Sequence, residues 1–179
     1  MGTPHTPSPA EPAQTAVPTP VEIRHIWVSG GHDFFGRHGQ DRHHHPARPV
    51  DSVQCHAGRG LVGDRFYDFK ADYKGQVTFF QSEVAEAVRD FLKTHTLDAS
   101  RFRRNVLIEG IDLNRLIGAT FHLAGVTFQG VEESRPCHWM DQAVGPGVHA
   151  FLKGRGGLRA RVLTSGVLRC GPVHLRLDA

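Results

Sequence analysis

A cysteine stands among charged and aromatic residues in the run Glu133 to Asp141 (ESRPCHWMD). Cys137 follows a proline, which fixes the backbone before it, and Arg135 and His138 flank it. Nearby positive charge favours thiolate over thiol, and the thiolate is the form that attacks electrophiles and binds metals. Free cysteines more often pack as small hydrophobes among aliphatic neighbours. The local sequence therefore allows two interpretations, a reactive or metal-binding thiolate and an inert packing residue.

The other two cysteines have different surroundings. Cys55 alternates with Val53 in a strand-like segment and Cys170 ends an apolar run, so we predict that both are packing residues. Three cysteines at wide spacings argue against a disulfide framework. No CxxC pair is present, so the sequence offers no evidence for a structural zinc site.

Histidines suggest two weaker alternatives. A Cys–His hydrolase needs an imidazole within hydrogen-bond reach of the sulfur and oriented by a third group. His138 adjoins Cys137, which does not place its ring there, and His56 and His149 have no signature around them. The run His43-His44-His45 suggests a metal site, but consecutive residues need not converge and metal sites need several convergent ligands. We interpret that run as a solvated loop.

Two basic segments have the chemistry to bind an anion. The run Arg101 to Asn105 holds three arginines, whose planar forks match phosphate oxygens, and an asparagine, which can contact a heterocycle edge. In the segment Gly154 to Arg161, glycines would let backbone amides approach an anion, but a Walker-type lysine and a following helix are lacking. Each segment alone is weak evidence, and a solvated basic loop is the simpler interpretation.

The elements that must position these residues are mostly short strands bounded by turn residues. The predicted strands cover 21–28, 50–56, 76–80, 105–109, 120–123, 126–132, 158–163 and 167–177. Ala124-Gly125 is expected to join one hairpin, and Thr164-Ser165-Gly166 a second, with a bulge at Gly171-Pro172. This pattern predicts a mostly β fold with a few helices, built as a barrel or highly curved sheets.

Two helices are expected between the strands. Ser82 can cap the first, whose apolar residues recur at the spacing of one buried face. Those residues are Val84, Val88, Phe91 and Leu92. A shorter helix is predicted over 148–153.

Composition limits the class of protein. Residues 1–20 contain six prolines and bury too little apolar surface to offset ordering entropy, so they predict a disordered tail before one domain over 21–179. The net charge of +3 is too small to indicate nucleic-acid binding, although it suits a small anionic ligand. No secretory signal is recognisable, and no run approaches the roughly eighteen apolar residues of a membrane span. The expected location is the cytoplasm.

In their order along the chain, six motifs resemble the MOSC family, the domain named for the C-terminal part of molybdenum cofactor sulfurases. The motifs are Gly60-Leu61-Val62-Gly63-Asp64-Arg65, Gln76-Val77-Thr78, Arg103-Arg104-Asn105-Val106, Gly110-Ile111-Asp112-Leu113, Arg135-Pro136-Cys137, and 154–162 with Ser165-Gly166. Each is unspecific alone, and the shared order carries the resemblance, which runs from about Val21 to the end. It implies a β-barrel-like fold.

The resemblance also implies residue roles. Cys137 matches the family's characteristic cysteine, thought either to carry sulfur as a persulfide or to ligate molybdenum of the bound pterin cofactor, molybdopterin. Arg104 and Asn105 match an Arg-Asn pair that would anchor the phosphate end of that cofactor.

Further positions match more loosely. Asp64 and Arg65 match a Gly-Asp-Arg turn, and we assign Arg65 a ligand-facing role and Asp64 a structural one. Arg135 and Arg159 are predicted to contact the cofactor as well. For the glycines of 154–159, a tight turn is the preferred interpretation over lining the site.

Three functions follow from the resemblance. The first is a sulfur carrier or sulfurtransferase, in which Cys137 delivers persulfide sulfur to a metal centre. The second is a molybdenum-cofactor reductase of N-hydroxylated compounds, with Cys137 as the metal ligand. The third is a non-catalytic module that binds the cofactor through Arg104 and Asn105. We expect a stand-alone domain, independent of pyridoxal phosphate. A cysteine desulfurase or an electron-donor protein and a molybdoenzyme acceptor are then the expected partners, without nucleic acid or membrane.

Overall fold

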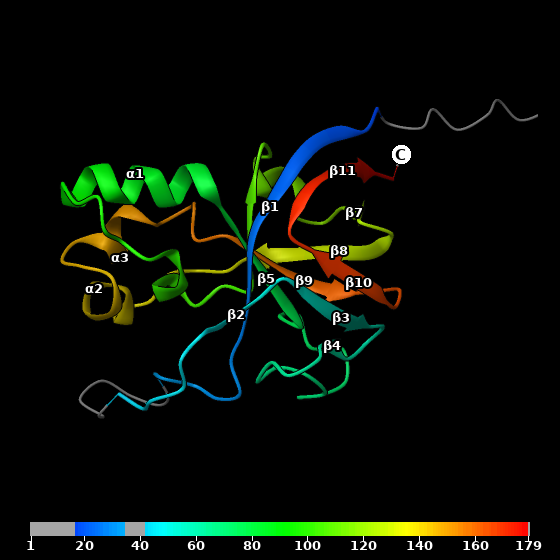
Figure 1. The fold of residues 1–179 in the computed structure, drawn as a ribbon, viewed down its shortest axis with the longest axis horizontal. Helices are drawn as coiled ribbons and strands as arrows, with labels where there is room; N and C mark the ends of the chain where they lie inside the picture. The colour runs from blue at the N-terminus through cyan, green and yellow to red at the C-terminus, as the bar shows by residue number, and fades with distance from the viewer. Residues whose placement is uncertain (1–16, 35–41, 179) are drawn as a thin grey trace, which may run out of the picture.

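The computed structural model describes residues 17–34 and 42–178, in which strands dominate (Figure 1). Seven of them are neighbours in the order β11-β7-β8-β9-β5-β6-β1, and β1 pairs with β11 to close the ring. They are β1 (Thr19–Val28), β5 (Val77–Gln81), β6 (Val106–Glu109), β7 (Thr120–Leu123), β8 (Val126–Glu133), β9 (Leu158–Val162) and β11 (Gly171–Leu177). The predicted mostly β, barrel-type fold is confirmed.

The beginning of the chain differs slightly from the prediction. Residues 1–16 of the predicted disordered tail lie outside the described residues. β1 begins at Thr19, two residues before the predicted first strand, because Thr19 and Pro20 already pair with β11.

Four short strands lie outside the barrel ring. β2 (Arg48–Val50) extends the sheet beside the end of β1, whereas β10 (Gly166–Arg169), β3 (Ser52–His56) and β4 (Gly60–Leu61) form a separate three-stranded sheet. The predicted strand over 50–56 therefore divides at Asp51 between two sheets.

The predicted hairpin between 158–163 and 167–177 is wrong. β9 pairs with β5 and β8, whereas β10 pairs with β3. The turn after β9 is held to β8, because the Thr127 amide donates to the Thr164 hydroxyl (2.8 Å). Gly171, at φ 123°, stands where the chain passes from β10 into β11, in place of the predicted bulge.

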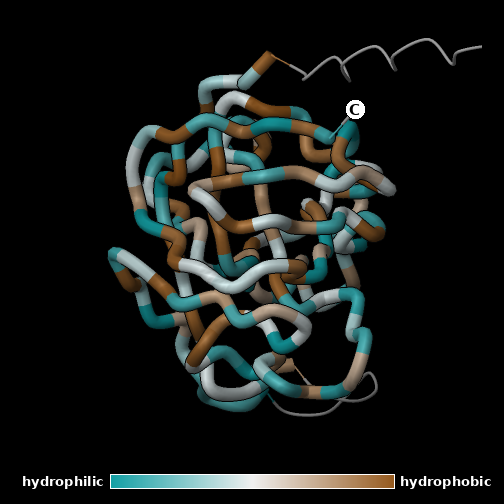
Figure 2. The backbone as a smooth tube through the Cα atoms, turned by 90° about the vertical axis from the view of Figure 1, so that its right-hand side faces the viewer, coloured by the Kyte–Doolittle hydropathy of each residue, from teal (hydrophilic) through white to brown (hydrophobic). Residues whose placement is uncertain are grey.

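The barrel interior is filled by alternate side chains of its strands. In β9 and in the first five residues of β8 every second residue is buried, the pattern of a strand with one face toward a core, and Figure 2 shows the alternation of hydropathy. Phe79 meets Phe121 and Phe128 edge-on, with ring centroids 5.7 and 5.4 Å apart. Such pairs stabilise the core beyond their buried area.

The two cysteines predicted to be packing residues differ in their burial. Cys55 is fully buried in the barrel core, as predicted, and burial raises the pKa of its thiol to about 12. The prediction for Cys170 is wrong, because that side chain is exposed at the passage from β10 to β11.

Helices cover one outside face of the barrel (Figure 1). They are α1 (Ser82–Leu92), α2 (Trp139–Ala143) and α3 (Val148–Phe151), with short 3-10 helices η1 (Ala99–Phe102) and η2 (Leu113–Leu116). α1 and η1 lie in the crossover between the parallel strands β5 and β6. Phe80 of β5 packs on Phe102 of η1, with centroids 4.4 Å apart, which joins sheet and helical layer.

The helices correct three predictions. Gln81, rather than Ser82, is the N-cap of α1, and no side chain caps the helix. Phe91, predicted on the buried face, is 46% exposed and packs its ring on Phe151. α3 ends two residues before the predicted boundary, and α2, directly after Cys137 and His138, has no counterpart among the predicted elements.

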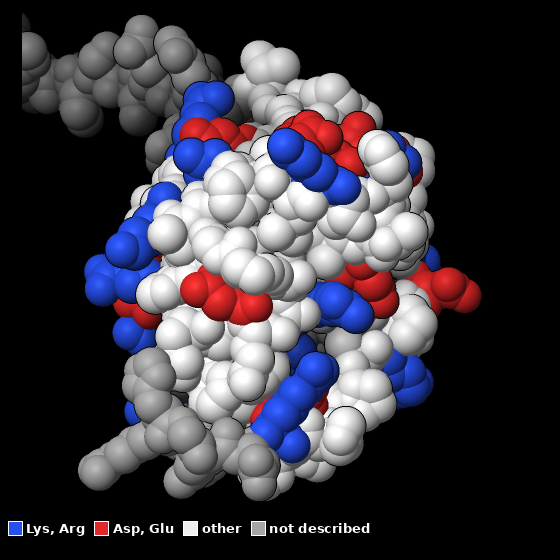
Figure 3. Space-filling view, turned by 90° about the vertical axis from the view of Figure 1, so that its left-hand side faces the viewer, with Lys and Arg blue, Asp and Glu red and all other residues white. Residues whose placement is uncertain are grey.

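The helical face carries acidic and basic side chains interspersed (Figure 3). In the described part of the chain, no helix is long and apolar enough to cross a membrane.

Candidate functional site

A pocket of about 150 Å³ lies where loops from distant parts of the chain meet outside the barrel. Cys137 lines it together with four arginines, Arg65, Arg103, Arg104 and Arg159. The fold therefore brings Cys137 together with three arginines predicted for the site, and adds Arg103. Asn105 and Arg135, also predicted for the site, are not among the lining residues.

Cys137 lies in the stretch between β8 and α2, which we call the Cys137 segment (Ser134–His138). Its side chain is exposed, so Cys137 is not a buried packing residue. Its carbonyl accepts from the Met140 amide (2.9 Å), and the His138 ring packs on Trp139 with centroids 4.5 Å apart. α2 thus follows directly and holds the sulfur-bearing residue by its backbone.

Arg104 fixes the start of the Cys137 segment at Ser134, which we call the base of the segment. Its Nη2 donates to the Ser134 carbonyl (2.7 Å), and its Nε donates to the carbonyl of Gly156 (3.0 Å). The pKa of Arg104 falls to about 10, first because of burial and next because of Arg159, while the charge of Cys137 acts in the opposite direction. The guanidinium therefore remains charged at neutral pH, within electrostatic reach of the Cys137 sulfur.

Glycines let this base close tightly. A Cβ at Gly156 would come within 2.5 Å of the Ser134 carbonyl oxygen and 2.8 Å of the Pro136 ring. Gly157, at φ 96°, would place a Cβ 2.2 Å from the Phe79 carbonyl oxygen. Only a residue without Cβ fits such approaches, so these two glycines serve close packing, in line with the preferred interpretation.

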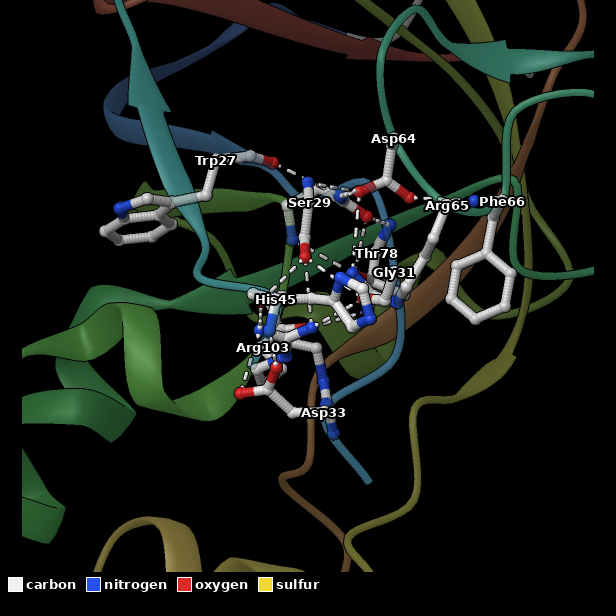
Figure 4. Close-up of polar contacts among 12 residues, drawn as sticks. Trp27, Ser29, Gly31, Asp33, His45, Asp64, Arg65, Phe66, Thr78 and Arg103 are labelled. Carbon is white, nitrogen blue, oxygen red and sulfur yellow. Dashed lines mark hydrogen bonds and ion pairs between the residues drawn. The ribbon is translucent and has the colours of Figure 1, made fainter. Parts of the chain in front are cut away.

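Beneath the pocket lies a polar group that we call the Asp64 cluster (Ser29, Asp64, Thr78 and Asn105). The Asp64 carboxylate accepts from the backbone amide of Ser29 (3.2 Å; Figure 4) and from the Asn105 amide (2.9 Å). The Asn105 oxygen accepts from the Thr78 amide and hydroxyl, at 3.0 and 2.9 Å. Asp64 and Asn105 are 6% and 2% exposed, so both hold the scaffold.

Arg65 leaves this cluster toward the pocket. Its Nη1 lies 3.5 Å from the Asp64 carboxylate, its Nη2 donates to the Arg103 carbonyl (3.3 Å), and its guanidinium lies over the Phe66 ring. Burial lowers the pKa of Arg65, and the Asp64 charge opposes that shift. These bonds are long, so Arg65 retains capacity to donate to a ligand.

Arg103 is engaged with the loop that follows β1. It donates to the Gly31 carbonyl (2.9 Å), the Ser29 hydroxyl (3.1 Å) and the His45 carbonyl, and lies 3.4 Å from the Asp33 carboxylate (Figure 4). Arg103 therefore fixes the described part of the loop that follows β1, which forms one wall of the pocket.

The two remaining arginines differ in access. Arg159 of β9 makes one ion pair among the described residues, a loose one of 3.8 Å with Glu132, and its side chain is 32% exposed. Arg135 is exposed and contributes a backbone hydrogen bond to the Glu133 carbonyl (2.9 Å). Arg159 is placed to contact a ligand in the pocket, and Arg135 lies outside its lining.

Aromatic residues complete the walls, and sequence reasoning missed them. Phe66 and Tyr73 lie on one side with centroids 5.1 Å apart, and Phe34 and Trp139 form another pair at 4.8 Å. They come from loops and a five-residue helix, so no periodicity links them. Phe66 could have been predicted from the sequence, because it directly follows Arg65, which was expected to face the ligand.

The histidines singled out from the sequence lie elsewhere. His43, His44 and His45 are exposed, and no three metal-ligating side chains gather within the described residues. His56 hydrogen-bonds the Tyr67 hydroxyl (2.6 Å).

A family model settles the relationship of this chain. The model of the MOSC domain matches residues 39–173. The chain belongs to the MOSC domain family. This family is associated with molybdenum-cofactor proteins, and the match confirms the resemblance drawn from the six motifs.

Solved structures with the same fold are distant in sequence. The YuaD protein from Bacillus subtilis has a TM-score of 0.71 at 13% identity, over 92% of this chain and 99% of that one. YiiM from Geobacillus stearothermophilus has a TM-score of 0.62 at 18% identity (89% and 75%), and YiiM from Escherichia coli 0.59 at 16% (91% and 70%). No curated protein sequence matches significantly. At these identities the likeness supports the fold alone.

Proposed function

We propose that this MOSC protein is a sulfur carrier or sulfurtransferase that works through Cys137. The Cys137 thiolate attacks the outer sulfur of a donor persulfide, forming a new S–S bond as the donor S–S bond breaks and the donor leaves as a thiolate. The carried sulfur then passes to a metal centre as sulfide: the S–S bond on Cys137 breaks, Cys137 leaves as a thiolate, and the reduced metal centre supplies the two electrons. The observation behind this proposal is that an exposed Cys137 shares a pocket with four arginines, whose charge stabilises both thiolate and persulfide anion.

The donor and acceptor belong to the same proposal. A cysteine desulfurase in the cytoplasm would supply the persulfide, and a molybdoenzyme would receive the sulfur. The exposure of Cys137 supports this arrangement, because a transferred sulfur must meet the donor's cysteine at the surface.

Reduction of N-hydroxylated compounds with molybdopterin is the second candidate. The donor set suits the two ends of that cofactor: Cys137 offers a thiolate to the metal, and Arg65 and Arg159 offer donors to the phosphate. When bound, the cofactor would supply the redox chemistry. The pocket of about 150 Å³ is below the roughly 300 Å³ at which small-molecule pockets begin, so it is small for the whole cofactor although its donors match both ends. Sulfur carriage is therefore our first proposal.

The test is intact-mass spectrometry of the protein after incubation with a cysteine desulfurase and cysteine. We expect a gain of one sulfur atom that Cys137→Ser abolishes and Cys170→Ser, which changes the other exposed cysteine, retains. Metal analysis of the same sample separates the candidates. Stoichiometric molybdenum and pterin without sulfur loading would move the protein to the reductase function, and neither signal in folded protein would refute both.

A further inference from the structure

The charge and size of the Cys137 pocket indicate what kind of donor it takes. We infer that Cys137 is also loaded directly by a small inorganic dianion that carries a transferable sulfur atom, with thiosulfate as the representative. This inference rests on the proposed function and adds a loading route that needs no partner protein.

The pocket has an excess of positive charge. The lining holds four arginines and, among the described residues, one carboxylate, Asp33, whereas Asp64 and Glu132 lie behind the lining, 3.5 Å from Arg65 and 3.8 Å from Arg159. Asp33 is already neutralised, because it accepts from Arg42 (2.9 Å) and from the His45 backbone amide (2.6 Å) and lies beside Arg103. A thiolate at Cys137 balances one further charge. The arginine-lined surface beside Cys137 therefore favours an anionic ligand.

The arginines divide into engaged and available ones. The guanidinium groups of Arg103 and Arg104 already donate hydrogen bonds to backbone carbonyls of the surrounding loops. Arg65 makes two long contacts and, within the described residues, none from Nε, whereas Arg159 makes only its loose pair with Glu132. Arg65 and Arg159 therefore provide charged donors directed at an oxyanion.

The size of the pocket selects a small anion. The pocket has a volume of about 150 Å³, below the roughly 300 Å³ at which small-molecule pockets begin. Thiosulfate, with two sulfur and three oxygen atoms, is a small ligand of the kind that such a pocket suits. Organic persulfides such as glutathione persulfide exceed it several-fold, and only their end would enter.

The transfer balances without an added oxidant or reductant. The Cys137 thiolate attacks the terminal sulfur of thiosulfate, and a new S–S bond forms on Cys137. The original S–S bond breaks with its electron pair on the departing sulfite, and the persulfide anion stays on Cys137. Arg65 and Arg159 stabilise the charge that develops on the sulfite oxygens.

The experiment compares two donors on the reduced full-length protein. One arm contains thiosulfate alone, and the other contains a cysteine desulfurase with cysteine; persulfide is read by intact mass, and sulfite by a colorimetric assay. We expect loading in both arms and one sulfite released per persulfide in the first. Loading by the desulfurase alone would overturn this inference and leave the proposed function intact, whereas loading in neither arm would overturn both.

A pair of arginine variants tests the role of the pocket. Arg159→Gln should raise the half-saturating thiosulfate concentration about tenfold or more. Arg161→Gln is the matched control, because Arg161 lies two residues along β9 and is bound to Gln129 and the Asp72 carbonyl outside the pocket. Equal thiosulfate saturation in Arg159→Gln, Arg161→Gln and wild type would refute binding in this pocket.

Discussion

The Asp64 cluster and the Cys137 segment lie against the same pocket but are built in opposite ways. In the cluster, Asp64 and Asn105 are buried and direct their polar groups at other parts of the protein. The segment is fixed at its base by Arg104 and Gly156, whereas its cysteine is exposed. A rigid buried support beside an accessible sulfur is what a reactive residue needs. The difference teaches that structural support and chemical reactivity are assigned to different residues around one pocket.

The sharpest test of that division removes the carboxylate of the cluster. Asp64→Ala leaves the buried Asn105 amide and Ser29 amide without their acceptor, so we expect a loss of about 3–5 kcal/mol in the free energy of unfolding. Denaturant unfolding measures it. The control Asp68→Asn removes the charge of a carboxylate that is exposed in its pair with Arg59, at a φ of 58° that Asn tolerates, and should leave the midpoint near the wild-type value. Equal effects of both variants would contradict the support role.

The buried thiol of Cys55 allows a pH-dependent test of the comparison. Burial raises the pKa of Cys55 to about 12, whereas an unfolded cysteine titrates near 8.5. The folded state therefore keeps its proton when the unfolded state loses it, so stability is retained below about pH 8.5 and falls as pH rises toward 12. The slope from this group is about 1.4 kcal/mol per pH unit.

Denaturant unfolding between pH 8 and 10.5 measures this slope. Cys55→Ala should remove that part of the decline. A decline of the same steepness in Cys55→Ala would assign it to other groups.

A glycine substitution tests how the segment is fixed. Gly156→Ala forces a Cβ against the Ser134 carbonyl and Pro136, so we expect a loss of about 1–3 kcal/mol and slower loading of Cys137. Gly30→Ala is the control, because a Cβ there meets nothing within 4 Å and its φ is not positive. Thermal unfolding and the mass assay measure both variants. Unchanged loading in Gly156→Ala would show that the base does not position the sulfur.

The smallest effect on stability is expected where the effect on function is largest. Cys137→Ser alters an exposed side chain and should change the free energy of unfolding by less than about 0.5 kcal/mol. It should nevertheless abolish persulfide formation. Chemical unfolding with the mass assay on one sample checks both, and retained loading would exclude Cys137 as the carrier.

Local signals predicted the parts of the fold that depend on local geometry. The hairpin β7–β8 has a two-residue turn in which Ala124 and Gly125 both take positive φ, the geometry that such a connection requires. The second predicted hairpin fails because strand partners depend on contacts across the chain. The turn after β9 is held by a hydrogen bond from the Thr127 amide of β8, and no residue near that turn in the sequence indicates this contact.

The site shows the same limit at the level of single residues. Arg104 and Asn105 are adjacent in one motif, but Arg104 lines the pocket and Asn105 lies in the Asp64 cluster. Successive side chains in extended backbone point to opposite sides, so a motif does not show which member meets a ligand. The residue types predicted an anion site with a thiolate, and the aromatic walls required the folded chain.

The closure of the barrel by β1 and β11 has a consequence for how the protein is made. Thr19 pairs with Leu175, so the ring cannot close until β11 has left the ribosome. Until then the edges of β1 and β7 stay unpaired and are open to other chains. Contacts of such sequence separation also form late and slowly. The nascent chain therefore passes through an aggregation-prone interval before β11 pairs with both edges.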